Sequence, residues 1–324
     1  MYKQAVIILL AVLAPFLILI VVWIDGLTDN DDKEVIVGNK DFTEQYIVGE
    51  LMKQLLEDRG FKVQLVSDLS SDGLRGGMEA GNIDICADYT GTVWVKHLAH
   101  EYKPGMDNND IYHVVKVEDQ GNGLIWLNPI WNDNLYALVS RTSYVLAIGV
   151  RTLSDLAWLY RDTEGKIWTA IGKEFSERAD GLPGLEKHYD FKIDESFILI
   201  KDDPLQSLKE QECDVAVGFG TDAAITQQYL HVYVDDWAFF PPYDLTPYVR
   251  RGIIDKYSEI PGILNELVGT FPGGGKPATP EIVAESRKAW QELNAKVGID
   301  EDIDKMKAAE VAHEYLVKHG LIEE

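Results

Sequence analysis

Two short stretches, far apart in the chain, share one order of residues: an Asp, an apolar run, an aromatic residue, then Gly and Thr. The first leads from Asp84 to Tyr89, and the second from Asp214 to Phe219. In each, the aromatic residue follows a short apolar strand, at the carboxyl end where open α/β sheets present their ligands. This repeated order suggests two similar lobes that face one cleft, although taken alone it is better explained by two ordinary strand ends.

Length and composition are compatible with two folded lobes and argue against one class of partner. The 324 residues suffice for two α/β lobes with adequate cores, and a hydrophobic fraction of 46% indicates a folded chain. Basic residues number 30 and acidic residues 54, which gives a net charge of −24. This balance argues against nucleic acid as a partner and against adsorption to an anionic membrane surface, because phosphate binding needs a basic surface.

The cysteines and histidines indicate neither a disulfide nor a metal site. Cys86 and Cys213 are the only cysteines, and they occupy nearby places in the two echoing stretches. If those stretches belong to different lobes, the thiols lie too far apart to bridge, so we expect two buried free thiols. The seven histidines are scattered and pair with no cysteine or acid at ligand spacing, which predicts no metal.

The N-terminal region carries a membrane signal. Residues 5–24 form an almost unbroken apolar run of about 20 residues, long enough to span a bilayer. Lys3 precedes the run and mostly acidic residues follow it, which places the amino terminus in the cytoplasm and the rest of the chain outside. We expect residues 1–32 to form an uncleaved anchor with a short tether. A cleaved signal peptide is the alternative, although its apolar region is usually shorter.

The pattern after the tether predicts the start of a doubly wound lobe. Asp41 is expected to cap the first helix, with Glu44 three residues on to complete a capping box. Ile47, Leu51 and Leu55 share one apolar face of that helix. The alternating strands and helices of this lobe are expected at residues 34–38, 41–60, 61–66, 72–80 and 83–87.

The chain is expected to cross between two lobes twice. A strand at 135–140 leads into the second lobe, residues 239–243 lead back, and a strand at 245–250 joins the first lobe. The fold class predicted is therefore α/β with two lobes. Its expected division is an N-terminal segment at 1–32, lobe I at 33–136 and 239–324, and lobe II at 137–238.

No catalytic pattern stands out in the chain. Gly-x-Ser-x-Gly, His-Glu-x-x-His and a phosphate-binding glycine loop are all missing from the sequence. We therefore expect no enzyme and no cofactor. An anchored enzyme that uses Asp88 or Glu177 as an acid–base group remains as an alternative, although neither has a paired nucleophile in the sequence.

Five segments in register resemble the substrate-binding proteins of glycine betaine/choline ABC transporters. They lie at residues 37–47, 82–92, 136–138, 178–183 and 241–244, and residues 310–321 are similar to the final helix of that family. The resemblance covers about residues 33–321 and implies a periplasmic-binding-protein fold, type II-like, with two hinge crossings. It implies a quaternary ammonium ligand held between the lobes and delivered to a membrane permease that has a separate ATPase subunit.

The resemblance also implies roles for eight residues of this chain. An aromatic cage would hold the cation, basic and hydroxyl groups would hold a carboxylate, and Asn134 would line the cage near the crossing strand. Phe219 stands where the family pattern has a tyrosine, so a ring face is kept and a hydroxyl is lost. The cage would comprise Tyr89, Tyr136, Phe219 and Tyr243, and the carboxylate clamp Lys40, Thr92 and Arg178.

The chemistry of these residue types fits that ligand class. A trimethylammonium group donates no strong hydrogen bonds, whereas ring faces offer it charge attraction and apolar contact, about 0.5–2 kcal/mol per ring. Lys40 and Arg178 favour a zwitterion such as glycine betaine over choline, which has no carboxylate. A receptor for choline, or for another zwitterion such as an amino acid, remains open. A sensor ectodomain is a further alternative, although Met1 to Gln4 leave no cytoplasmic signalling domain.

Overall fold

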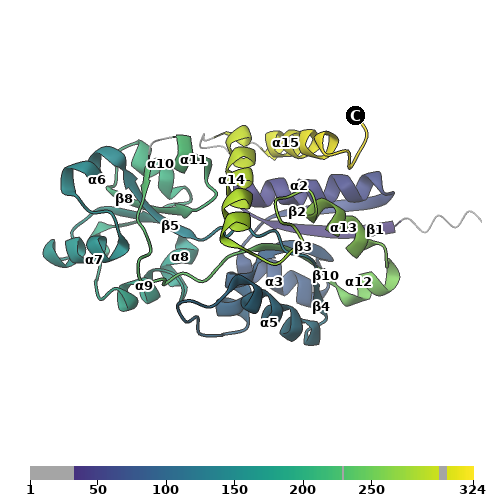
Figure 1. Ribbon diagram of the computed structural model, residues 1–324, viewed down its shortest axis with the longest axis horizontal. Coiled ribbons are helices and arrows are strands. Elements are labelled where there is room, and N and C mark those ends of the chain that lie inside the picture. Colours follow the sequence, from purple (N-terminus) through teal and green to yellow (C-terminus); the bar gives the residue numbers. More distant parts are fainter. Residues whose placement is uncertain (1–32, 228–229, 299–304) are drawn as a thin grey trace, which may run out of the picture.

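The computed structural model describes residues 33–227, 230–298 and 305–324. The predicted anchor and tether at 1–32 lie outside these ranges. Within them, every helix is too short or too polar to cross a membrane. The described chain forms two lobes side by side, with one upright helix between them (Figure 1).

The first lobe is built on a mixed sheet of five strands in the order β2-β1-β3-β10-β4. The strands β1, β2 and β3 are parallel, whereas β10 runs antiparallel to both of its neighbours, β3 and β4. The predicted return of the chain to the first lobe is confirmed by β10. The strands are β1 (Lys33–Lys40), β2 (Phe61–Leu69), β3 (Ile85–Tyr89), β4 (Leu124–Trp126) and β10 (Leu245–Arg250).

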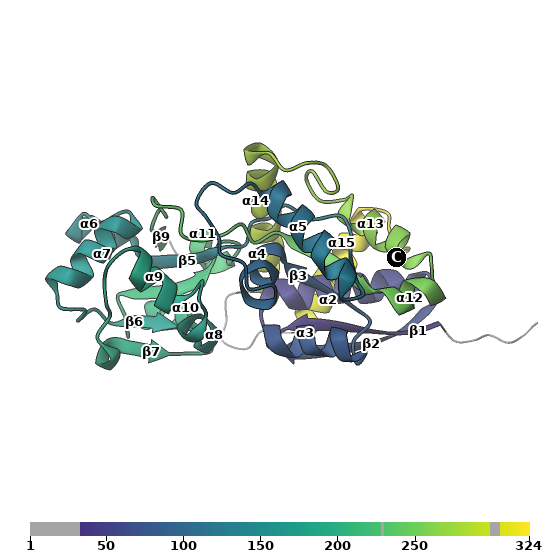
Figure 2. The same cartoon turned by 90° about the horizontal axis from the view of Figure 1, so that it is seen from below.

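Helices cover both faces of this sheet (Figure 2). The predicted apolar face of the first helix is confirmed, because Ile47, Leu51 and Leu55 are fully buried. The last helix, α15, packs along it. The helices of this part of the chain are α2 (Thr43–Asp58), α3 (Ser71–Ala80), α4 (Thr90–Thr92), the π-helix η1 (Val93–His97), α5 (Asn108–Gly121), α12 (Arg251–Lys256), α13 (Ile260–Val268), α14 (Pro280–Val297) and α15 (Lys305–Lys318).

The second lobe repeats the plan with a five-stranded sheet in the order β7-β6-β8-β5-β9. Its central strand β8 pairs in parallel with β6 and antiparallel with the crossing strand β5. The strands are β5 (Tyr136–Arg141), β6 (Thr169–Ile171), β7 (Ile198–Ile200), β8 (Val215–Phe219) and β9 (Leu230–Val232). The helices are α6 (Thr142–Ile148), α7 (Leu153–Asp162), α8 (Lys173–Glu177), α9 (Leu182–His188), the 3₁₀ turn η2 (Glu195–Phe197), α10 (Pro204–Lys209) and α11 (Ala223–Gln227).

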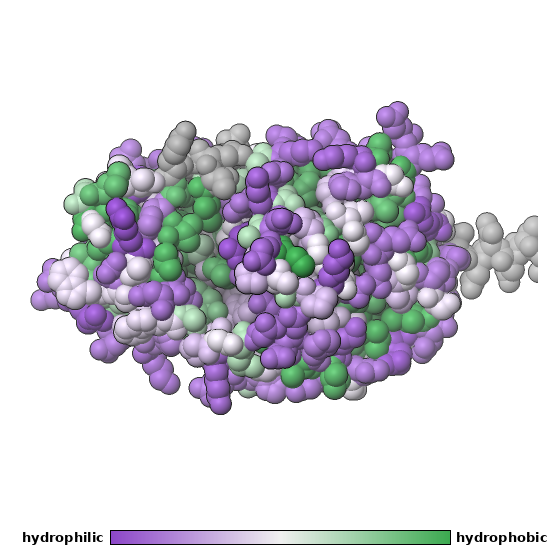
Figure 3. All heavy atoms as spheres, viewed as in Figure 1, coloured by the Kyte–Doolittle hydropathy of each residue, from purple (hydrophilic) through white to green (hydrophobic). Residues whose placement is uncertain are grey.

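The two cysteines lie in different lobes. Cys86 belongs to β3, and Cys213 lies just before β8. Both are buried and free, as predicted. Hydrophilic side chains cover much of the face in Figure 3, and apolar side chains gather there over parts of both lobes.

The predicted capping box at the start of α2 is wrong. Phe42 is the residue that precedes the helix, its backbone is extended, and no side chain caps the helix there. The Glu44 side chain instead turns inward and is 1% exposed. Burial of Glu44 between the lobes therefore replaces the exposed capping role that the sequence spacing indicates.

Besides the two crossings of the chain, α14 links the lobes. It lies between them in Figure 1. Gln291 donates to the carbonyl oxygen of Gly220 at 2.9 Å, and Asn294 donates to that of Thr221 at 2.8 Å. Because both carbonyls follow β8 of the second lobe, the helix connects the first lobe to the carboxyl end of that strand.

Close packing at Gly91 generates a prediction about stability. A Cβ at this position would lie 2.6 Å from the carbonyl oxygen of Pro242 and 2.8 Å from the Tyr243 ring. We expect Gly91→Ala to lower the free energy of unfolding by about 1–3 kcal/mol, because the returning segment must shift. Chemical denaturation measures the change.

The matched control is Gly76→Ala in α3. Gly76 is exposed, and a Cβ there would meet nothing within 4 Å. This variant should match the wild type or gain up to about 1 kcal/mol, because alanine favours helix. Equal unfolding midpoints for the two variants would contradict the packing described.

Candidate functional site

One cavity of about 920 Å³ lies between the two lobes. It receives side chains from β1, β3 and α4 of the first lobe and from β5, α8 and β8 of the second. All eight residues that the sequence singles out line it: Lys40, Tyr89, Thr92, Asn134, Tyr136, Arg178, Phe219 and Tyr243. The structure therefore brings the eight together, while their part in holding a ligand stays a prediction.

Aromatic rings from both lobes meet in this cavity. Tyr136 lies at the centre, with its ring centroid 5.2 Å from that of Phe219 and 5.8 Å from that of Tyr243. On its other side, the Phe175 ring of α8 lies at 4.8 Å. We call Phe42, Tyr89, Tyr136, Phe175, Phe219 and Tyr243 the ring cluster.

Phe42 is a member of the ring cluster that the sequence analysis missed. Its ring stacks on Phe219 at 4.9 Å and on Tyr89 at 6.1 Å. It thus joins the two aromatic residues of the echoing stretches, one from each lobe. The available signal was its position two residues after the end of β1, since Tyr89 and Phe219 lie at the ends of β3 and β8. The extended backbone of Phe42, at φ −143°, turns the ring into the cleft.

The ammonium group of Lys40 already has an internal partner. Its Nζ lies 2.5 Å from Oδ1 of Asp88, and both side chains are almost fully buried. The same Nζ lies 5.3 Å from the centroid of the Tyr89 ring. In a buried ion pair of this kind, each charge compensates the other for the loss of water. Removal of one partner leaves the other charge uncompensated. Asp88 therefore acts here as a counter-ion, which does not favour a role as a catalytic acid or base.

Arg178 is held by acids on two sides. Its Nε donates to Asp180 at 2.7 Å, and Nη2 pairs with the second oxygen of the same carboxylate. Its Nη1 donates to Glu174 at 2.9 Å. The guanidinium carbon lies 5.6 Å from the centroid of the Tyr136 ring, and Tyr243 donates its hydroxyl to Asp180. Burial lowers the pKa of Arg178, but the charges around it outweigh burial and raise its pKa well above the ordinary value.

A buried carboxyl group, Glu44, joins the crossing segment to the rings. Tyr89 donates its hydroxyl to Glu44 Oε1 at 2.8 Å, and Asn132 donates to the same oxygen at 2.8 Å. Asn134 approaches it at 3.3 Å and accepts the Thr221 hydroxyl at 2.9 Å. Asn134 thus uses its amide to tie the lobes together, besides lining the cavity.

Burial raises the pKa of Glu44 to about 7. Its Oε2 and Oδ1 of Asn294 are both buried without a hydrogen-bond partner among the described residues. The Asn294 side chain lies within hydrogen-bonding reach of the Glu44 carboxyl. The hydrogen bonds around the Glu44 carboxyl, that of Asn294 included, lower its pKa, and burial outweighs them. No pattern in the sequence points to this role, because the spacing of Glu44 is typical of a helix start.

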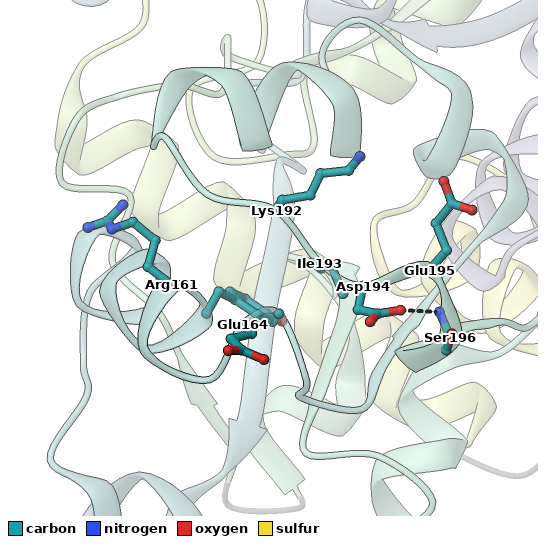
Figure 4. A pocket seen from close by; sticks show the side chains of 9 residues that line it. Arg161, Glu164, Lys192, Ile193, Asp194, Glu195 and Ser196 are labelled. Carbon is teal, nitrogen blue, oxygen red and sulfur yellow. Dashed lines mark hydrogen bonds between the residues drawn. The ribbon is translucent and has the colours of Figure 1, made fainter.

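A second pocket, of about 630 Å³, lies on the surface of the second lobe (Figure 4). Arg161 donates to the carbonyl oxygens of Tyr189 and Asp190, at 3.0 and 2.7 Å. Asp194 accepts from the backbone of Ser196 at 2.9 Å. Because these charged groups are engaged locally, the cavity between the lobes is the better candidate site. In the described ranges, no three His, Cys, Asp or Glu side chains are placed to hold a metal ion.

Residues 33–318 match the model of the family described as OpuAC, the substrate-binding domain of ABC-type glycine betaine transport systems. The glycine-betaine-binding protein of Pseudomonas aeruginosa is 27% identical, over 89% of this chain and 88% of that protein. The carnitine transport binding protein OpuCC of Listeria monocytogenes is 28% identical, over 80% of this chain and 87% of that protein.

The same likeness holds in three dimensions. The solved structure of apo YehZ from Escherichia coli superposes with a TM-score of 0.58 and 27% identity, over 89% of this chain and 99% of that one. The two lobes therefore form the periplasmic-binding-protein fold that the resemblance implied.

The position of Glu44 generates a prediction about pH. The folded pKa of about 7 lies above the value of 4.5 for a solvated carboxyl. The unfolded chain therefore loses this proton first, and the group lowers stability progressively as pH rises from 4.5 to 7. Glu44→Gln keeps the acceptor for Tyr89 and carries no charge at any pH, so we expect it to stabilise the fold near pH 7 by an amount on the order of 1–3 kcal/mol.

Urea denaturation of both proteins at the two ends of that pH range measures the difference. Asp222 and Asp244, whose pKa values burial raises to about 7 and about 8, add slopes of the same sign to both proteins. Only the difference between the proteins therefore reports Glu44. A difference that is the same at both ends would contradict the raised pKa of Glu44.

Proposed function

The chain belongs to the family of substrate-binding domains of ABC-type glycine betaine transport systems, and on that premise we propose that it holds a quaternary ammonium compound in the cavity between its lobes. It is a substrate-binding protein of a transport system and not an enzyme. The ring cluster is the observation that carries the proposal. Its rings come from both lobes and converge on one cavity.

The ring cluster suits a trimethylammonium group. Such a cation has apolar methyl groups around a diffuse charge, so ring faces attract it while also burying its surface. Tyr89, Tyr136, Phe219 and Tyr243 are the proposed cage, and Phe42 joins them. Because Phe42 stacks directly on Phe219 at 4.9 Å, a ligand between these two rings requires them to separate. Rings from both lobes closing on one cation would favour the closed state of the protein.

Glycine betaine or a related zwitterion is the first candidate ligand. The relatives from P. aeruginosa and L. monocytogenes are named for glycine betaine and carnitine, both of which carry a carboxylate. In this proposal Lys40, Thr92 and Arg178 hold that carboxylate, and Asn134 lines the cage. One observation favours choline as the second candidate. Both basic groups already pair with internal acids, Lys40 with Asp88 and Arg178 with Asp180.

The proposal extends to the arrangement of the whole chain. The proposed division is lobe I at 33–136 and 239–324 and lobe II at 137–238, and the presence of two separate sheets supports a division into two lobes. The two crossings would act as hinges in the type II-like manner. The family is extracytoplasmic; we expect residues 1–32 to anchor the chain on the outer face of the membrane, or to be cleaved. The chain would deliver its ligand to a permease that works with a separate ATPase subunit.

Calorimetric titration of the purified full-length chain with glycine betaine and with choline tests this function. We expect Tyr136→Leu to weaken binding of either ligand by about tenfold or more, because the central ring face is lost while an apolar side chain remains. The matched control is Tyr144→Leu, on α6 of the same lobe and outside the cavity lining.

Wild-type affinity in the control and weaker binding in Tyr136→Leu would support the cage. Binding of neither compound by the wild type would refute the proposed ligand class. Lysine and arginine are then the next ligands to titrate, as the amino-acid alternative requires. Equal affinities for Tyr136→Leu and the wild type would refute the role of the ring.

A further inference from the structure

The carboxylate of Glu174 bridges the two lobes at the cavity wall. Glu174 belongs to α8 of the second lobe, and its Oε1 lies 2.9 Å from Nη1 of Arg178 in that lobe. The same oxygen lies 3.2 Å from Nζ of Lys96 in η1 of the first lobe. The nearby side chain of Ser71, at the start of α3, helps to lower the pKa of this carboxylate. One internal carboxylate thus binds an arginine of one lobe and a lysine of the other.

Glu174 keeps its negative charge in this position. Burial raises the pKa of its carboxyl, but the positive charges of Lys40 and Arg178 outweigh burial and lower the pKa to about 2. The Glu174 side chain is 35% exposed, whereas that of Arg178 is 4% exposed. The glutamate therefore faces the open part of the cavity, and the arginine lies behind it.

These contacts are the ones that the carboxylate of a zwitterionic ligand would need. Arg178 has three nitrogen atoms, and each already donates to an internal acid: Nε and Nη2 to Asp180, and Nη1 to Glu174. The guanidinium also lies 5.6 Å from the centroid of the Tyr136 ring. Arg178 therefore contacts both Glu174 and the Tyr136 ring of the proposed cage.

A ligand carboxylate has two ways to approach Arg178, and both are unfavourable. It can displace Glu174, which leaves a partly buried carboxylate without its arginine. It can instead lie beside Glu174, where two negative charges repel each other. Choline has no carboxylate, so it leaves the pair intact and brings a positive charge toward a side chain of opposite sign.

From these contacts, we infer that Glu174 determines specificity: it occupies the anion position beside the ring cluster and disfavours quaternary amines that carry a carboxylate relative to those that do not. This inference rests on the proposed function, since it concerns which member of that ligand class the cavity favours. Glu174 acts here by occupying Arg178 and Lys96, and the cage itself is unchanged by it.

Calorimetric titration of the full-length chain tests the inference with glycine betaine and choline as the two probes. We expect Glu174→Gln to raise the affinity for glycine betaine by about tenfold or more relative to that for choline. Glu174→Ala, which removes the side chain beyond Cβ, should change the ratio in the same direction. Thermal unfolding of each variant verifies that it is folded.

The matched control is Glu177→Gln on the same helix. Glu177 lines the same cavity and is exposed, and it forms no ion pair within the described ranges. This control removes the same charge from α8 without freeing Arg178 or Lys96, so it should shift the ratio toward glycine betaine by much less than Glu174→Gln does. A ratio that shifts equally in the control would show a general charge effect and overturn the inference.

The possible outcomes distinguish a failure of this inference from a failure of the proposed function. If both ligands bind and the ratio of their affinities is the same in the wild type and in both Glu174 variants, the inference is wrong and the function stands. If neither compound binds to the wild type or to any variant, the proposed function fails and the inference fails with it.

Discussion

Each charge that the cleft removes from water requires an opposite charge, and this constraint governs the arrangement of the site. Lys40 pairs with Asp88, and Arg178 pairs with Asp180 and Glu174. These ion pairs place basic groups beside aromatic rings without leaving a buried charge unpaired. A quaternary ammonium ligand has to satisfy the same constraint, and ring faces satisfy it without the strict geometry of hydrogen bonds.

The two lobes meet at a buried carboxyl group of raised pKa as well as at charged pairs. Glu44 collects donors from the end of β3 and from the crossing segment, and Asn134 extends the connection to Thr221. From the other side, α14 reaches the same part of the second lobe through Asn294. A movement between the lobes would act on this small group of hydrogen bonds. The site and the connection between the lobes are therefore adjacent, through Tyr89.

The sequence predicts which strand ends face the cleft, because strand patterning and residue order are local properties. That is sufficient to find Tyr89 and Phe219, and the family resemblance adds the other six residues. It is insufficient for the counter-ions: Lys40 and Asp88 are 48 positions apart, and only the folded chain brings them within 2.5 Å. Glu44 shows the reverse case, since a local spacing typical of a cap is overridden by burial between the lobes. Phe42 was missed because its ring direction depends on its own extended backbone, two residues after the end of β1.

The claim that ring faces bind a positive charge between the lobes is tested most directly by removing the charge from the ligand while keeping its shape. The comparison is a titration with choline and with its neutral carbon isostere, in which a tert-butyl group replaces the trimethylammonium group. Cation–π attraction from several rings predicts that choline binds tighter by about tenfold or more. Equal or tighter binding of the isostere would show that the cavity recognises apolar bulk alone and would contradict the account.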